Sequence, residues 1–386
     1  MNDTLTRQLG SFAIVTSSKR IFLSDYVLSG IPFYRSKEII EKALKQNIST
    51  ELFITYKRFE EIKMQFGVPV AGDILISAVG ERAGIPYVVK KSDGDFYFKD
   101  GNLIWIKDFK DHASADYLCY YFKSNNGKKQ LESTMIGSAQ KALTIVGLKQ
   151  IELLLPRLPD QESIAEVLSS LDDKIDLLHR QNKTLEEVAE TLFRQWFVEE
   201  GENLEVGKLG EIIELFDNKR IPLSSTERDK LKIGNLYPYY GAATIMDYIN
   251  KYIFDDDYLL LGEDGTVQDE DGYPILQRAI GKCWVNNHTH VIKGKKGYSN
   301  NFLEILLKHI NISHLVTGAV QPKINQANLK ELDIPKPAIE KVEKFSLIID
   351  PLYNKKHFNL QQIKQLETIR DTLLPKLMSG AVRVMN

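Results

Sequence analysis

The chain has 386 residues, 43% of them hydrophobic and 26% charged, with a formal net charge of -2. This composition is typical of a soluble globular protein with two or more domains, and the near-balance of charge means that any nucleic-acid surface must be a local patch. No apolar run reaches the roughly 18 residues of a membrane span, and the first ten residues lack the layout of a signal peptide, so we expect a cytoplasmic protein with no membrane partner.

Residues 1–158 are predicted to form a mixed α/β domain. Apolar segments bounded by glycine or polar residues at 72–80, 85–91 and 102–108 indicate strands, and DYLCYYFKSNN at 116–126 indicates a helix that follows them. The block holds 22 lysines and arginines against 17 acidic residues. Its Cys119, like Cys283 further on, stands alone in apolar surroundings, so we expect two buried free thiols.

The segment GSAQKALTIVGLKQIELLLP at 137–156 returns 181 residues later as GAVQPKINQANLKELDIPKP at 318–337. Gly137 becomes Gly318, Gln140 becomes Gln321, and Leu148-Lys149 becomes Leu329-Lys330. The period is far longer than the roughly 20 to 50 residues of solenoid repeats. It predicts a duplicated half-protein.

Residues 159–200 are predicted to form one long helix with a coiled-coil seam. The seam follows a strict 4,3,4,3 spacing through Ile164, Leu168, Leu171, Ile175, Leu178, Asn182, Leu185, Ala189, Leu192 and Trp196. Ser163 and Glu166 suggest a capping box at the start. Asn182 is the only polar seam residue, and it is either a solvated defect or a residue that fixes register and partner. With 11 acidic residues against 4 basic ones, the segment is a poor partner for phosphates.

Residues 201–336 repeat the order of the first block, with strands expected at 258–265, 283–293 and 333–337 and a helix at 301–311. Residues 337–386 then form a second, less regular helix that supplies a partner for the first. Its apolar stripe begins at Val342, Phe345, Ile349 and Leu352, falters at Lys356 and Asn359, and resumes at Ile363, Leu366, Ile369, Leu373 and Leu377. Pro351 is expected to kink or restart this helix, and a three-residue shift in the repeat offset indicates a stammer.

Five segments in this order resemble the specificity subunit of type I restriction-modification systems. They are GIPFYRSKEI (30–39), LFRQWFVEE (192–200), the stretch from Pro238 to Gly265, WVNNHTHVIK (284–293) and LLPKLMSG (373–380). None is diagnostic alone, but together on a duplicated framework they are specific. The resemblance covers essentially the whole chain.

The resemblance implies an α/β (α+β) fold with an internal pseudo-two-fold repeat. Two target recognition domains, 1–158 and 201–336, would be separated by helices 159–200 and 337–386, which pack as an antiparallel coiled coil. The chain would read an asymmetric, two-part DNA target and position two methyltransferase subunits and the restriction subunits. It would hold no cofactor itself, because S-adenosylmethionine, ATP and Mg²⁺ belong to those partners. A stand-alone coiled-coil DNA-binding scaffold or transcriptional regulator is the alternative.

A helix of about 50 Å can hold two readers one DNA turn apart, which predicts roughly five to eight unread base pairs between the half-sites. Phosphate contacts are expected from Lys128, Lys129, Lys141, Lys295, Lys296 and Lys323. Gln140 and Gln321 either offer amides to an adenine edge or stabilise their turns. Candidates for base specificity are Arg35, Lys37 and Arg82 in the first domain and Tyr239, Tyr240 and Asn287 in the second.

Catalytic interpretations of the sequence are weaker. GERAG at 80–84 lacks the spacing of a cofactor-binding glycine loop and is interpreted as a turn. His288 and His290 are two apart on an expected strand and would share a face, but packing or DNA contact is favoured over a metal site. The acidic run Asp255 to Asp257, with Glu263 and Asp264, is interpreted as a solvated turn rather than a magnesium cluster. We therefore expect neither catalytic nor metal-binding residues in this chain.

Overall fold

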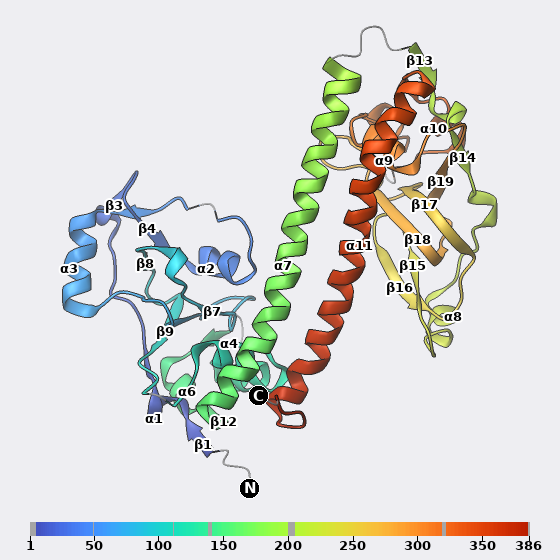
Figure 1. The fold of residues 1–386 in the computed structure, drawn as a ribbon. Helices are drawn as coiled ribbons and strands as arrows, with labels where there is room; N and C mark the ends of the chain where they lie inside the picture. Colours follow the sequence, from blue (N-terminus) through green and yellow to red (C-terminus); the bar gives the residue numbers. More distant parts are fainter. Residues whose placement is uncertain are drawn as a thin grey trace. The chain divides into compact units, whose positions relative to one another are not determined.

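The computed structural model describes residues 5–48, 50–110, 112–137, 141–199, 205–318 and 322–384. By its internal packing the chain divides into a first unit, Met1–Leu178 with Gln362–Asn386, and a second unit, His179–Gln361. Each unit combines one globular domain with part of each of two long helices, α7 (Leu158–Arg194) and α11 (Ile339–Met378) (Figure 1).

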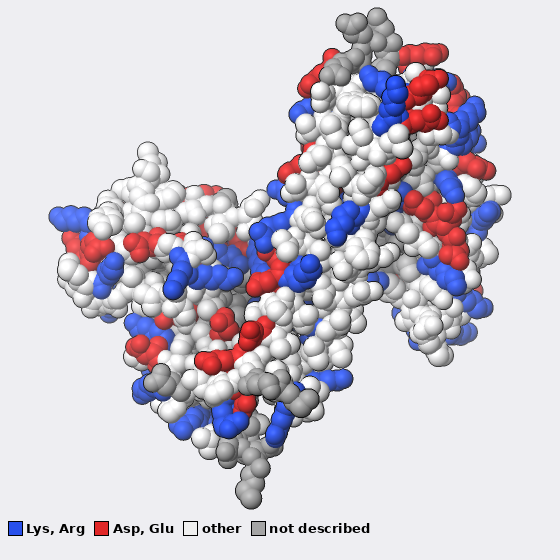
Figure 2. All heavy atoms as spheres, in the orientation of Figure 1, with Lys and Arg blue, Asp and Glu red and all other residues white. Residues whose placement is uncertain are grey.

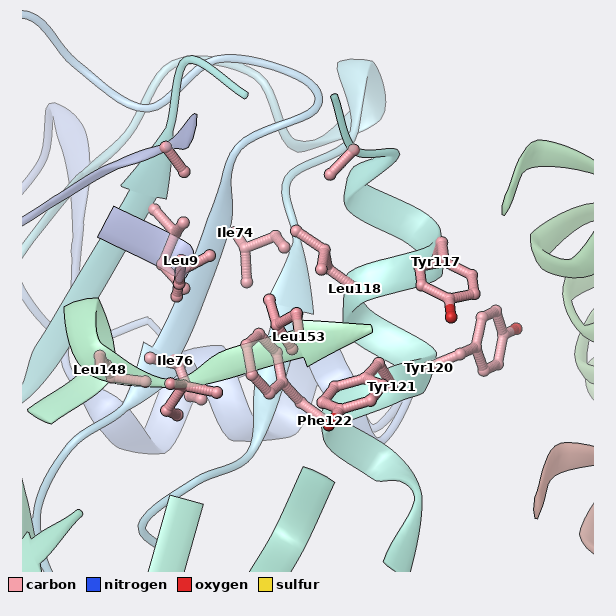
Figure 3. Packing of buried hydrophobic residues seen from close by; sticks show 14 of the residues in the cluster. Leu9, Ile74, Ile76, Tyr117, Leu118, Tyr120, Tyr121, Phe122, Leu148 and Leu153 are labelled. Carbon is pink, nitrogen blue, oxygen red and sulfur yellow. The ribbon is translucent and has the colours of Figure 1, made fainter. Parts of the chain in front are cut away.

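The first unit is built on a four-stranded antiparallel sheet. Its order is β2-β9-β6-β7, formed by Ile14–Thr16, Leu103–Lys107, Ile74–Ser77 and Pro86–Val88. Ile74 and Ile76 pack against Leu118 and Phe122 of α4 (Ala115–Lys123), as Figure 3 shows. Leu75 points to the opposite face, into a second cluster with Trp105. Because both faces are covered, β6 is buried throughout, and its three apolar residues are followed directly by the buried Ser77 without polar alternation.

A second sheet of order β3-β5-β4-β8 extends this unit, with α3 packed beside it through Phe59 and Ile62. The expectation that strands precede helices is wrong here, because α2 and α3 come before β6. Helices α2 and α3 each bury only a few residues and are otherwise polar, so their sequences show no clear apolar stripe with a helical period. The remaining elements are β1 Leu5–Gln8, α1 Leu9–Phe12, β3 Tyr26–Val27, β4 Ile31–Tyr34, α2 Ser36–Ala43, β5 Phe53–Ile54, α3 Tyr56–Phe66, β8 Tyr97–Phe98, α5 Asn125–Ser133, β10 Met135–Ile136, β11 Ala142–Leu143, α6 Ile145–Gln150 and β12 Glu152–Leu155.

The second unit has a six-stranded sheet of order β14-β19-β17-β18-β15-β16. Its first four strands repeat the antiparallel order of the first unit, and α9 packs beside them as α4 does. The prediction of a single strand at 283–293 is wrong, because these residues form the end of β18, a turn and most of β19. The elements are β13 Glu205–Lys208, β14 Ile213–Leu215, α8 Ser225–Lys230, β15 Tyr237–Tyr240, β16 Ile245–Ile249, β17 Phe254–Gly262, β18 Leu276–Val285, β19 Thr289–Gly294, α9 Asn300–Lys308, α10 Gln326–Lys330 and β20 Asp333–Lys336.

Both domains close in the same way, by pairing their first and last strands. β1 pairs with β12, and β13 pairs with β20. Directly after β1 and β13, the backbone amides of Leu9 and Leu209 donate to the carbonyls of Ile151 and Leu332, with both distances 2.9 Å. The next residue in each half is a glycine whose added Cβ would come within 2.9 Å of a lysine side chain, Lys149 or Lys330. The Leu-Gly pair at 9–10 and 209–210 is therefore a second repeated element, which the sequence analysis missed.

The two long helices run antiparallel, as predicted. Ile175 and Leu178 pack against Ile363 in the first unit, and Trp196 packs against Phe345 in the second, so residue numbers rise along α7 as they fall along α11. The ten seam positions of α7 are all buried or half-buried, as are Ile349, Ile363, Leu366 and Leu373 of α11. After Arg194 the chain continues as a π-helical turn, Gln195–Glu199. The predicted fold class, two domains with an antiparallel helix pair and an internal repeat, is confirmed.

The polar seam residues of the two helices meet each other. Asn359 Nδ2 donates to Asn182 Oδ1 at 2.8 Å and to Gln181 Oε1 at 2.9 Å. Asn182 is only 6% exposed, so its interpretation as a solvated defect is wrong. Among the described residues, Asn182 Nδ2 and Asn359 Oδ1 have no partner. A register shift that set either amide against a leucine would leave further polar atoms unpaired, so this layer favours one register.

Three details of the helices differ from expectation. Ser163 does not cap α7, which begins at Leu158, and the Ser163 hydroxyl donates to the carbonyl of Pro159 inside the helix. Pro351 does not restart α11, because it lies on an exposed face where water can satisfy the Leu347 carbonyl. Ile369 is 46% exposed, and the next residue, Arg370, pairs with Asp172 of α7 instead.

A buried charge cluster joins the helices to the sheet of the second unit. Arg278 pairs with Asp257 and Glu304, and Lys356 pairs with Glu186 and Glu304. Burial of Glu186 opposes its ionisation, but the hydrogen bond from Lys356 and the charge of Lys308 lower its pKa. Glu186 is thus held ionised, and the ion pairs of the cluster fix α7, α9 and α11 to one another within this unit.

His357 lies beside this cluster, and its Nε2 has no hydrogen-bond partner among the described residues. Burial, followed by the charge of Arg278, lowers the pKa of His357 below its ordinary 6.5, although Glu304 and Asp257 oppose that shift and Lys356 adds to it. The unfolded chain therefore binds more protons, and stability should fall as pH drops below about 6.5. We expect His357→Leu to flatten the dependence of melting temperature on pH between 7 and 5. A slope identical to that of the wild type would contradict this.

Candidate nucleic-acid interface

The repeated segment forms the same structure in both units, a hairpin that docks on the end of a central strand. In the first unit Leu143 N donates to Ala78 O at 2.8 Å, and Gly80 N donates to Lys141 O at 3.3 Å. In the second unit Ile324 N donates to Glu263 O at 2.8 Å, and Gly265 N to Pro322 O at 3.0 Å. We call these places the first and second hairpin sites. Gln140 and Gln321 lie outside the described residues.

Glycine is required where each hairpin turns. Gly137 and Gly318 have φ angles of 98° and 93°, in the left-handed region that other residues rarely adopt. They occupy equivalent positions of the repeat, which explains why both halves keep glycine there. The two halves therefore share the backbone conformation of the hairpin, while the side chains around it differ between them.

The turn that receives the first hairpin is rigidly built. Gly80 and Gly84 have φ angles of 91° and 94°. The buried Ser77 hydroxyl donates to the carbonyl of Arg82 at 2.5 Å and accepts from the amide of Ile85 at 2.9 Å. The segment 80–84 is thus a strand-end turn, as expected, and it presents the Arg82 side chain to solvent.

A cavity of about 550 Å³ lies beside this turn. The charged residues Lys128, Lys141, Glu81 and Glu132 line it, together with apolar side chains that include Ile85, Leu131 and Met135. Lys128 and Lys129 belong to α5, and both are exposed. The structure therefore brings Lys128 and Lys141 of the predicted set together at the first hairpin site, next to the turn that carries Arg82.

Two other predicted residues of the first domain are elsewhere. The Arg35 guanidinium donates to Glu38 at 2.6 Å and to Glu51 at 3.2 Å at the start of α2, so it is tied to that helix. Lys37 lies 3.8 Å from Glu41 one turn along the same helix. The structure gives Arg35 a structural role and does not place either residue in the cavity by the hairpin.

The second hairpin site is occupied by a closed polar network. The buried His290 has Nδ1 at 2.6 Å from Asp217 Oδ2 and Nε2 at 2.8 Å from the Ile324 carbonyl. Both ring nitrogens face acceptors, an arrangement that a doubly protonated imidazole satisfies. Arg220 bonds Glu263 at 2.7 Å and the carbonyls of Asn287 and Thr289. Lys323 lies 3.5 Å from Glu263.

Burial of the Asp217 carboxyl opposes its ionisation, but the hydrogen bond and charge of His290 hold its pKa below the ordinary 3.8. Donor atoms of Asp217, Glu263 and His290 lie within 4.8 Å of one another, a spacing that suits a metal ion. Each of these donors is already engaged by Arg220, Lys323, Gln326 or its neighbours. The group is therefore built as an ion-pair network that fixes the hairpin to the sheet.

The remaining predicted residues of the second domain separate into buried and exposed ones. Tyr239 and Tyr240 are buried, with hydroxyls bonded to Leu223 N and Arg278 O, so their prediction as surface contacts is wrong. Because successive side chains of β15 point to opposite faces, Tyr239 and Tyr240 pack into two different hydrophobic clusters. Asn287 is exposed in the turn before β19, and Lys296 is exposed after it. Lys295 donates to the Gly210 carbonyl at 2.9 Å.

The two histidines do not share a face, because His288 belongs to the turn and His290 to β19. His288 Nδ1 lies 2.6 Å from Asp264 and is half exposed, whereas His290 is buried. In the acidic run, Asp256 pairs with Lys293 and Asp257 with Arg278. Asp217 and Arg220 were not predicted as site residues, since nothing local marks an Asp and an Arg as partners of residues 43 to 73 positions away.

On the face that Figure 2 shows, basic and acidic side chains are intermingled, which fits local patches better than one basic surface. Within the described residues, none of the helices combines the length and apolarity that crossing a bilayer requires.

Comparison with known proteins gives a consistent result. A Haemophilus influenzae protein named as a type I restriction enzyme specificity subunit is 35% identical over 153 residues, which cover 40% of this chain and 38% of that protein. The MjaIX specificity subunit of Methanocaldococcus jannaschii is 29% identical over 313 residues, 71% of each chain. The S subunit of a type I restriction-modification system from M. genitalium has the same fold, with a TM-score of 0.68 at 16% identity over 100% of this chain and 97% of that one.

The family model described as "Type I restriction modification DNA specificity domain" matches residues 1–187 and again 201–368. The two matches correspond to the two repeats that share a hairpin, a strand order and a long helix. The chain therefore belongs to the family of type I restriction-modification DNA specificity proteins.

Proposed function

We propose that this chain is the DNA-recognition subunit of a type I restriction-modification complex, in which each domain reads one part of a split duplex target. The observation that carries the proposal is the pair of hairpin sites, identical in backbone but different in side chains. Ala78 and Ile104 of the first site correspond in strand position to Glu263 and His290 of the second. A duplicated backbone with diverged side chains suits two readers of different sequences.

Within each site the exposed cations are suited to phosphates and the turns to base edges. Lys128, Lys129 and Lys141 are exposed at the first site, and Lys323 and Lys296 are exposed in the second unit. Ammonium groups act as point charges toward the DNA backbone, while side chains on fixed turns, such as Arg82 and Asn287, can reach base edges in the major groove. For Gln140 and Gln321, which lie outside the described residues, both predicted roles, amides offered to an adenine edge or stabilisation of their turns, stay predictions.

The catalytic steps are proposed to reside in partner subunits. Methyl transfer and cleavage would use S-adenosylmethionine, ATP and Mg²⁺ bound there, and this chain would supply recognition and position. At the second hairpin site Glu263 pairs with Arg220, and at the other end of β17 Asp257 and Asp256 pair with Arg278 and Lys293, which supports a structural role for these three acids. The complex is proposed to act on DNA in the cytoplasm.

The long helices expose apolar side chains at positions that the repeat relates, and we call the exposed pair in each unit a patch. The first unit exposes Leu177 of α7 and Ile369 of α11, at 50% and 46%. The second unit exposes Phe358 of α11 and Val188 of α7, at 53% and 43%. The repeat offset of 181 converts Leu177 into Phe358 and Val188 into Ile369. We propose that these first and second patches each bind one methyltransferase subunit, and that restriction subunits join the resulting complex.

Exchanging residues 201–336 for the block of a related subunit should change one half of the target and leave the other half intact. The junctions are suitable because β13 and β20 pair within the exchanged block. The donor should carry an acid at the position of Glu304, which pairs with Lys356 outside the block. The readout is the methylome of a host that expresses the chimera with its methyltransferase.

The expected motif keeps one half-site and a gap of roughly five to eight base pairs. Loss of both half-sites together, or a continuous motif with no gap, would contradict two independent readers. Sequence-specific DNA binding without any host methylation would favour the transcriptional-regulator alternative.

A further inference from the structure

We infer that Arg82 recognises a guanine in the half-site read by the first domain. This rests on the proposed function, and it names both the residue and the base. Guanidinium groups make the commonest specific contact in the major groove, two parallel hydrogen bonds to O6 and N7 of guanine. An arginine that serves this purpose must be accessible, without a competing acidic partner, and held at a fixed backbone position.

Arg82 is accessible and has no acidic partner, and almost every other arginine of the chain fails one of these two requirements. Its side chain is exposed, and its guanidinium has neither a hydrogen bond nor an ion pair among the described residues. Among the described arginines only Arg7 shares that lack of a partner, and it belongs to the β1–β12 pair, a different sheet from the β10–β11 hairpin. The arginines that have a partner are Arg20, Arg35, Arg58, Arg157, Arg180, Arg194, Arg220, Arg228, Arg278, Arg370 and Arg383.

The backbone of Arg82 is fixed although its side chain is free. Its carbonyl accepts from the buried Ser77 hydroxyl, and the turn is closed by Ala83 N to Gly80 O at 3.0 Å and Gly84 N to Ser77 O at 2.7 Å. Gly80 itself bonds the hairpin through Lys141 O. The guanidinium therefore extends from a rigid base, which limits the entropy lost when it binds.

The surroundings supply the complementary phosphate contacts. Lys128 and Lys141 line the cavity next to the turn, so a duplex that reached Arg82 would also meet two ammonium groups. In the second unit, the residue two after the matching Gly265 is Val267, which is buried. Arg220, the arginine nearest the second hairpin, is held by Glu263. Recognition of guanine by an arginine is therefore assigned to the first half-site alone.

The test selects binding sites from a library of random-sequence duplexes with the full chain in its methyltransferase complex. Wild type, Arg82→Ala, Arg82→Lys and Lys141→Ala are compared, each after a melting curve that checks folding. For Arg82→Ala we expect one G·C position of one half-site to lose about tenfold or more of its preference while the other half-site is unchanged. Arg82→Lys should regain affinity but less discrimination.

Lys141→Ala should weaken all sequences alike, lower the salt dependence of binding and leave the motif intact. The inference is wrong if Arg82→Ala retains the wild-type motif, whether or not its affinity falls, because Arg82 would then contact phosphate or nothing. It is also wrong if the wild-type motif lacks a G·C pair in the affected half. If the wild-type complex enriches no motif at all, the proposed function itself fails, which is a separate outcome.

Discussion

Replacing Leu171 and Leu178 together by aspartate should lower the free energy of unfolding of the first unit by about 5 kcal/mol or more. Leu178 packs in a cluster with Ile175 and Ile363 between the two helices, and it is almost fully buried. Each substitution removes apolar contacts and brings a carboxylate into the apolar seam that faces α11, in a segment already rich in acids. Such a loss is comparable to the whole stability of a typical domain.

Leu177→Asp is the matched control, because it makes the same chemical change one residue away at a half-exposed position. Its effect on stability should stay within about 0.5 kcal/mol. Urea unfolding followed by circular dichroism measures both variants. Equal stability of the double variant and the control would show that the helices do not depend on this seam.

Substituting one exposed patch at a time should remove one methyltransferase subunit from the complex. Leu177→Glu with Ile369→Glu alters the first patch, and Val188→Glu with Phe358→Glu alters the second. A partner that buries a large apolar side chain typically loses about 2 kcal/mol or more when a charge replaces it, roughly a 30-fold loss of affinity. Native mass spectrometry at a fixed protein concentration should then detect one bound methyltransferase subunit for either double variant. It should detect none for the variant that combines all four substitutions.

Folding is not expected to suffer, since all four side chains are about half exposed. Lys183→Glu on α7 serves as the control for added negative charge, because Lys183 is 71% exposed and makes a surface ion pair with Glu187. Two bound subunits in every variant would show that the partner docks elsewhere. Loss of both subunits from a single altered patch would show that the two sites are not independent.

Periodic and repeated features were predictable from the sequence. The seam of α7, the 181-residue repeat and the strand-end turn at 80–84 each depend on local spacing, which the chain displays directly. The same holds for the helices at α4 and α9, whose large apolar residues stand together. By contrast, α3 buries only Phe59 and Ile62 among eleven residues, a pattern too sparse to separate from a loop.

The second hairpin site could not be predicted, because it depends on contacts between distant residues. His290 meets Asp217 and Ile324, which are 73 and 34 positions away. Tyr239 and Tyr240 appeared suited to DNA contact as aromatic residues in a family-like motif, yet β15 lies inside the sheet and buries both. Arg35 and Arg82 are equally basic in the sequence, and only the position of Glu38 distinguishes a tied guanidinium from a free one.

The C-terminal end of α11 belongs to the core of the first unit, where Leu377 and Met378 are buried with Leu9, Leu118 and Leu168. The C-terminal end of α11 therefore completes the hydrophobic core of the first domain. A premature stop before residue 373 would leave the second domain with its own hydrophobic cluster intact, while opening the core beneath the first. Truncation at the end of α11 is thus expected to destabilise the first domain, the more distant of the two in the sequence, and to spare the second.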